Sequence, residues 1–173
     1  MIFLNGSRYP LYYPQYISGY EKVKITTTSR MIMTETEQRT KGLVIFGATG
    51  DLCKKKIIPA LYNLWKKGLL PENFVITGTA RREPTVEQWK QSLGDYPEKF
   101  FHHLDYVSTD LTNPETFTHL PDYLEDNTYF LSVPPERYED AIINLKEAGL
   151  LDNPETSRVV IEKPFGYDYK SAD

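Results

Sequence analysis

The sequence has few of the features that mark exported, membrane-bound or polyanion-binding proteins. Cysteine occurs once, at Cys53, in 173 residues, so the chain forms no internal disulfide and we expect a reducing, cytoplasmic setting. Uninterrupted apolar runs are far shorter than the roughly 20 residues of a membrane-spanning helix. Positive charge is not in excess, since the net charge is −4, which argues against nucleic acid or an anionic membrane as a partner.

Histidine is also scarce, and no metal site is predicted. The three histidines, His102, His103 and His119, lie before an expected strand and within an expected helix. We interpret them as structural or surface residues and not as catalytic ones.

The rest of the composition is that of a globular domain, but the first 40 residues lack the regular apolar pattern of the residues that follow. Hydrophobic residues make up 40% and charged residues 25% of the chain, enough for one core. Residues 1–40 contain tyrosines and prolines without a sustained period, so we expect an irregular extension. Alternatively, translation starts at Met31 or Met33, and the residues before that start are not part of the protein. The domain is therefore predicted at 41–173, cut short at its C-terminal end.

From residue 42 onward, short apolar runs alternate with longer amphipathic ones. This alternation predicts βαβ units, an α/β class and a doubly wound parallel sheet of the Rossmann type. Strands are expected near 43–47, 74–79, 105–109, 128–133 and 158–162. Helices are expected at 52–67, from 84 through 93, after Asn113 and Pro114, and at 135–148, with Pro59 kinking the first helix or marking its true start.

A glycine turn follows the first apolar run. Gly47, Gly50 and the small Cys53 match the spacing Gly-x-x-Gly-x-x-small, a relaxed form of the dinucleotide-binding fingerprint. Glycines in such a turn let the backbone approach a pyrophosphate at a helix N-terminus. An ordinary structural turn explains two glycines equally well, so the motif alone leaves both interpretations open.

Arginines follow the second expected strand, about 30 residues after the glycine turn. NAD-preferring folds usually place an acidic residue there to bind the ribose hydroxyls, whereas Arg81 can pair with the 2′-phosphate of NADP. The alternative is a solvated charge pair at Arg81 and Arg82.

With these motifs in place, the chain resembles the coenzyme domain of the glucose-6-phosphate dehydrogenase family. The resemblance covers 42–173 and is carried by the stretches 47–56, 68–73, 80–81, 133–135 and 162–166. It implies NADP as cofactor and NADP-dependent oxidation of D-glucose 6-phosphate to 6-phospho-D-glucono-1,5-lactone, in the oxidative pentose phosphate pathway of glucose metabolism.

The resemblance also implies roles for individual residues. The turn opened by Gly47 would bind the pyrophosphate, Arg81 would bind the 2′-phosphate, and Lys163 would contact substrate and nicotinamide. The full set of implied coenzyme residues is Gly47, Thr49, Gly50, Asp51, Leu52, Lys56, Arg81, Pro134, Tyr138 and Lys163.

The family pattern continues beyond the last residue of this chain, Asp173. The missing part carries the substrate-phosphate contacts and the catalytic histidine–aspartate pair, so we expect the isolated chain to be inactive and to meet glucose 6-phosphate only when that part is supplied. The alternative is a non-catalytic coenzyme-binding or subunit-interaction module, forming a homo- or hetero-oligomer. A short-chain NADP reductase fits less well, because Tyr167 and Lys170 lack the Tyr-x-x-x-Lys spacing.

Overall fold

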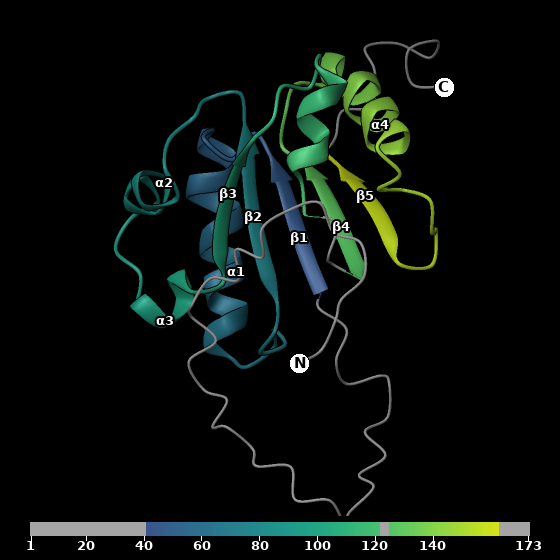
Figure 1. Ribbon diagram of the computed structural model, residues 1–173. Helices are drawn as coiled ribbons and strands as arrows, with labels where there is room; N and C mark the ends of the chain where they lie inside the picture. The colour runs from purple at the N-terminus through teal and green to yellow at the C-terminus, as the bar shows by residue number, and fades with distance from the viewer. Residues whose placement is uncertain (1–40, 122–124, 163–173) are drawn as a thin grey trace, which may run out of the picture. The chain divides into compact units, whose positions relative to one another are not determined.

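A parallel sheet forms the centre of the part of the chain that the structure describes. This computed structural model describes residues 41–121 and 125–162, drawn as ribbon in Figure 1. Its strands are β1 (Lys41–Phe46), β2 (Val75–Ala80), β3 (Leu104–Ser108), β4 (Asp126–Leu131) and β5 (Ser157–Ile161). Their spatial order is β3-β2-β1-β4-β5, and every neighbouring pair is parallel. This is the strand order of a doubly wound dinucleotide-binding fold, and it confirms the predicted fold class.

The winding direction reverses between β3 and β4, so β1 lies between β2 and β4. Phe46, at the end of β1, is level with Thr79 of β2 and Leu131 of β4. The carboxyl ends of these three strands therefore meet at one edge of the sheet, where ligands of open α/β folds bind.

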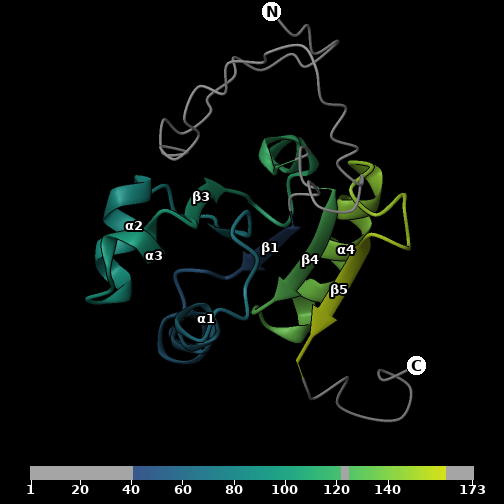
Figure 2. The same ribbon diagram turned by 90° about the horizontal axis from the view of Figure 1, so that it is seen from below.

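Helices cover both faces of the sheet. One face carries α1 (Ile58–Lys66), α2 (Val86–Leu93) and α3 (Glu98–Phe101), and the other carries α4 (Tyr138–Glu147) and a 3₁₀ helix at Pro114–His119. Figure 2 shows α1 and α4 on opposite sides of the strands. In the described ranges, no helix is long and apolar enough to span a membrane.

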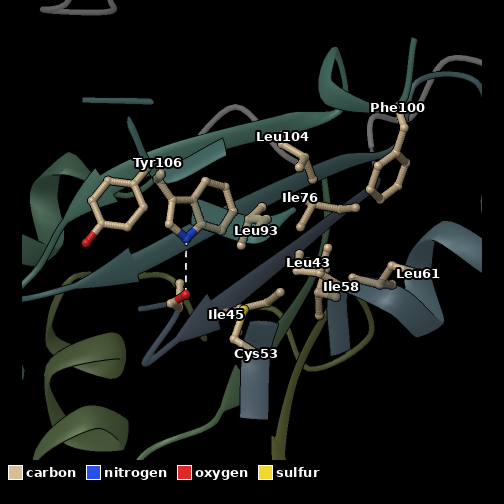
Figure 3. Packing of buried hydrophobic residues seen from close by; sticks show 12 residues of the cluster. Leu43, Ile45, Cys53, Ile58, Leu61, Ile76, Leu93, Phe100, Leu104 and Tyr106 are labelled. Atoms are coloured by element: carbon tan, nitrogen blue, oxygen red, sulfur yellow. Dashed lines mark hydrogen bonds between the residues drawn. The ribbon is translucent and has the colours of Figure 1, made fainter. Parts of the chain in front are cut away.

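Two hydrophobic cores follow from the alternation of side chains along the strands. Leu43 and Ile45 of β1 pack towards α1 and α2, in the cluster of Figure 3, whereas Val44 and Phe46 pack towards α4. Because both faces of β1 are covered, its sequence is a continuous apolar run instead of an alternating one.

The first predicted helix is divided in two. A π-helical turn at Cys53–Ile57 leads into α1, and Pro59 occupies the first turn of α1. Proline has no N–H to donate and is tolerated only in the first turn of an α-helix. The helical residues nevertheless run without a break from Asp51 to Lys66, so Pro59 does not mark the true start of the helix. The irregularity lies in the π-helical turn directly before it, and such turns are a usual cause of kinks in helices.

The other helices differ from their predictions in length or type. The helix expected from residue 84 begins at Val86, because Thr85 forms a capping box with Gln88. The segment after Asn113 is a 3₁₀ helix, although Asn113 caps it as predicted. The segment predicted at 135–148 starts as a 3₁₀ turn, Pro135–Arg137, before α4. The short α3 was not predicted.

Candidate functional site

The glycine turn closes tightly against the neighbouring strands. Gly47 has a φ of +81°, and a Cβ built on it would collide with the carbonyl oxygen of Ser132, just after β4. The N–H groups of Gly47 and Ala48 both donate to the carbonyl of Thr79, at 2.8 and 3.0 Å. A side chain at position 47 is thus excluded twice, by backbone conformation and by space.

A helical turn begins immediately after Gly50. The N–H of Lys54 donates to the carbonyl of Gly50 at 3.2 Å, whereas the first N–H groups of a helix have no acceptor within it. Asp51 and Leu52 are exposed at this position. The backbone donors and the positive end of the helix dipole therefore face the carboxyl edge of the sheet and suit an anion.

The carboxylate of Asp51 has a local partner. It accepts a hydrogen bond from Lys55 Nζ at 2.7 Å, and that hydrogen bond, together with the charge of Lys55, lowers the pKa of Asp51. Lys56, the next residue, is exposed. Cys53 is fully buried in the core below the turn, and burial raises the pKa of its thiol to about 12, so it is a packing residue and not a nucleophile.

The loop after β2 is anchored by β3. Arg81 and Arg82 are both exposed, but the hydroxyl of Tyr106 donates to the carbonyl of Arg82 at 2.7 Å. Burial raises the pKa of Tyr106 to about 12, which keeps this donor protonated at neutral pH. The backbone that carries the two arginines is therefore held in place.

Trp89 ties α2 to the glycine turn. Its indole Nε1 donates to the carbonyl of Ala48 at 3.1 Å, the hydrogen bond dashed in Figure 3. Its ring lies over Gly78, where a Cβ would overlap the indole, and beside the ring of Tyr106, with the ring centroids 5.4 Å apart. Trp89 and Tyr106 thus support the site, and neither was singled out for this from the sequence.

The remaining predicted residues lie on the β4 and β5 side of the same edge or outside the description. Pro134 is exposed after β4, and Tyr138, at the start of α4, donates its hydroxyl to the carbonyl of Glu162 at 3.3 Å. Glu162 follows β5 directly. Lys163 and the extension at 1–40 lie outside the described residues.

The histidines lie elsewhere. His103 Nε2 accepts from the indole of Trp65 at 3.1 Å, and its Nδ1 is 2.9 Å from the carbonyl of Phe74. His102 is close to Glu98, and His119 is exposed on the 3₁₀ helix. His103 is a structural residue, as the sequence predicts.

Comparison with known proteins identifies a family. Residues 44–173 match the model described as "Glucose-6-phosphate dehydrogenase, NAD binding domain". The chain belongs to the glucose-6-phosphate dehydrogenase family. It is 34% identical over 159 residues to glucose-6-phosphate 1-dehydrogenase of Chlamydia muridarum, and 33% identical over 150 residues to that of Leuconostoc mesenteroides. Each match covers 75% of this chain and 31% of the relative.

Solved structures of the family support the same assignment. The crystal structure of glucose-6-phosphate 1-dehydrogenase from Mycobacterium avium superposes with a TM-score of 0.67 at 32% identity, covering 77% of this chain and 32% of that one. A glucose-6-phosphate dehydrogenase in complex with its substrate, glucose 6-phosphate, has a TM-score of 0.66 at 26% identity. The predicted family and its dinucleotide coenzyme domain are thus confirmed, while the chain spans about a third of the length of these relatives.

Proposed function

We propose that this chain binds NADP along the carboxyl edge of the sheet and serves the oxidation of D-glucose 6-phosphate to 6-phospho-D-glucono-1,5-lactone. The observation that carries the proposal is the turn at Gly47, pressed against Ser132 and followed directly by a helix N-terminus. The N–H groups of Gly47, Ala48 and Gly50 are already bonded within the chain. A pyrophosphate fits at the first N–H groups of the following helix, which have no acceptor within it and lie at the positive end of its dipole.

Buried hydroxyls on both sides of the turn support a polar ligand. Thr79 Oγ1 and Ser132 Oγ are buried and have no hydrogen-bond partner among the described residues. Thr79 lies near the end of β2 and Ser132 directly after β4, and the glycine turn passes between them. Buried polar groups are normally satisfied, so this edge suits a ligand rich in hydrogen-bonding groups.

Each predicted residue has a role in this proposal. Thr49, Gly50, Asp51 and Leu52 surround the pyrophosphate, and Arg81 binds the 2′-phosphate. Lys56 and Tyr138 face the coenzyme, and Pro134 lies beside the nicotinamide. Lys163 comes directly after Glu162, whose carbonyl accepts a hydrogen bond from Tyr138, and contacts the substrate and the nicotinamide.

When bound, the coenzyme accepts a hydride from the sugar. This chain's residues hold and orient it, and taking the hydroxyl proton is the work of a base in the catalytic part of the family. We therefore propose a coenzyme domain that needs that part for turnover. The alternative, a coenzyme-binding or subunit-interaction module without catalysis, predicts binding but no turnover even when a family catalytic part is added.

The proposal is tested by calorimetric titration of the full chain with NADP and with NAD. We expect NADP to bind about tenfold more tightly or better, and Arg81→Gln to remove about tenfold of that preference while NAD binding stays unchanged. Lys99→Gln, which removes an exposed charge on α3, is the matched control. Absence of binding to either dinucleotide would overturn the proposal. Turnover of glucose 6-phosphate after addition of a family catalytic part separates the proposal from its alternative.

We further propose a cytoplasmic setting, supported by Cys53, a buried free thiol.

Association with a second subunit also stays a prediction. Gel filtration of the purified chain at increasing concentration tests this association, and an elution volume that stays at that of a monomer would contradict it.

A further inference from the structure

The two outermost strands of the sheet, β3 and β5, differ in how their outer sides are closed. In a parallel ladder, the backbone groups of alternate residues face the neighbouring strand, and those of the residues between them face outward. The carbonyl of His103 accepts from the N–H of Ile76 in β2, so the N–H of Tyr106 faces outward. That N–H donates to the carboxylate of Asp105 at 2.8 Å. The outer side of β3 is therefore partly closed by one of its own side chains.

The outer side of β5 is open. The N–H of Asn127 in β4 donates to the carbonyl of Thr156 at 2.7 Å, so the backbone groups of Ser157, Val159 and Ile161 face away from β4. The loop before β5 accepts the N–H of Ser157, but the N–H groups of Val159 and Ile161 have no acceptor among the described residues. Sheets of this strand order commonly carry a sixth strand at this place. The outer side of β5 therefore suits a further strand.

The side chains of β5 do little to prevent such pairing. Edge strands are commonly protected by charged residues, proline or a bulge. The strand Ser157–Ile161 contains no proline, and it pairs with β4 in an unbroken register. Its one charged residue, Arg158, is already paired with Asp126 of β4 at 2.6 Å. Val160 is 38% exposed. The outer side of β5 is thus a short β-branched strand whose charge is neutralised.

One side of α4 continues this surface. The hydroxyl of Tyr138 donates to the carbonyl of Glu162, directly after β5, so the side of α4 that carries Tyr138 faces β5. Ile142 and Lys146 lie on that side, because each follows at an interval of one helical turn. Ile142 is 37% exposed. If two such helices meet antiparallel, Lys146 of one comes close to Glu139 of the other, and neither has an ion pair in the described part of the chain. This side of α4 is therefore complementary to itself in charge.

We infer that two copies of this chain associate through β5, edge to edge and antiparallel, about a two-fold axis at Val159. In this register Val159 pairs with its own counterpart, and the N–H of Ile161 meets the outward carbonyl of Ser157 in the second copy. Arg158 lies opposite Val160, so no like charges face each other across the pair. The whole length of β5 is paired, and each free N–H group gains an acceptor.

This association is independent of coenzyme binding. The glycine turn follows β1, and β4 separates β1 from β5. Pairing of two β5 strands therefore leaves the carboxyl edge around β1 open, and the dissociation constant for NADP should be the same in the monomer and in the dimer.

The test measures the dimer dissociation constant of the full chain by analytical ultracentrifugation. We expect Val160→Lys to raise this constant about tenfold, because the new ammonium group meets Arg158 of the second copy. Val160→Glu should lower it, because a carboxylate there meets the same Arg158. The side chain of Val160 is exposed, so both variants leave the core intact, which circular dichroism checks. Leu69→Lys, at an exposed apolar residue beyond the end of α1, is the matched control and should leave the constant unchanged.

Amide hydrogen exchange shows which surface is used. Exchange at Val159 and Ile161 should slow as the concentration of the chain rises. A monomer at every concentration would overturn the inference, and so would a dimer in which these two amides exchange as fast as in the monomer. Slow exchange in a monomer would mean that a segment of the same chain covers β5, and it would overturn the inference too.

The sign of the charge at position 160 tests the register. Equal effects of Val160→Lys and Val160→Glu on the dimer dissociation constant would overturn the pairing about Val159. Titration of the same samples with NADP tests the proposed function separately, so either proposal can fail while the other stands.

Discussion

Polar groups have different roles at the two edges of the sheet, which are the amino edge, where the strands begin, and the carboxyl edge, where they end. At the amino edge, Arg158 pairs with Asp126 at 2.6 Å, and the ring of His103 lies between Trp65 and Phe74. At the carboxyl edge, Arg81 and Arg82 are exposed, and the structure gives neither an ion pair among the described residues. The amino edge therefore uses its polar groups to stabilise the fold. At the carboxyl edge, Asp51 is paired with Lys55, but the side chains of Arg81 and Arg82 stay exposed and can meet a ligand.

The largest expected difference between the edges comes from two glycines with positive φ. Gly47→Ala should lower the free energy of unfolding by about 3–5 kcal/mol, because the new Cβ meets the Ser132 carbonyl in a strained backbone conformation. Gly68→Ala, at the end of α1, has an open surrounding and should lower it by only about 1 kcal/mol. Urea denaturation measures both. Equal losses would show that the contact with Ser132 is unimportant.

Removing His103 should affect stability without affecting the ligand. His103→Ala leaves the indole N–H of Trp65 without its acceptor and the Phe74 carbonyl without its partner, which should lower the free energy of unfolding by about 2–3 kcal/mol. The dissociation constant for NADP, measured under conditions where the variant is folded, should stay unchanged. A weakened NADP affinity would contradict the proposed division between the edges.

Alkaline pH should destabilise the fold through two tyrosines. Burial raises the pKa values of Tyr106 and Tyr129 to about 12, above the value of about 10 for an unfolded chain. The folded state favours their neutral forms. The stability that these neutral tyrosines give to the fold is therefore fully present below a pH of about 10 and is lost as the pH rises towards 12. Denaturation curves across that range should show the loss. Tyr106→Phe and Tyr129→Phe should each make it shallower, and an unchanged pH profile in both would refute this account.

The smallest effect is expected at the exposed pair of Lys55 and Asp51. Both side chains are largely solvent-exposed, and such pairs add little to stability. Lys55→Gln should leave the melting temperature unchanged and raise the pKa of Asp51 towards its ordinary value, as followed by NMR titration of the carboxyl carbon. A clear drop in melting temperature would mean that the pair supports the glycine turn.

Local patterns in the sequence predicted the strands, the glycine turn and the arginine after β2, because each depends on residues close together in the chain. They did not predict that Trp89 bonds to Ala48 or that Tyr106 holds Arg82, since these partners are 41 and 24 positions apart. The division of the first helix was signalled by Pro59, but the π-helical turn before it was not. From the sequence, Arg82 was interpreted only as half of a solvated charge pair. Its contact with Tyr106 depends on tertiary packing, which local patterns do not reveal.

The most direct test of the central claim is an amide NMR titration of the chain with NADP. We predict the largest shifts at Thr49, Asp51 and Leu52 in the glycine turn and at Arg81 after β2, with the amides around His103 and Arg158 unmoved. Shifts centred on the amino edge, or none at saturating NADP, would contradict it.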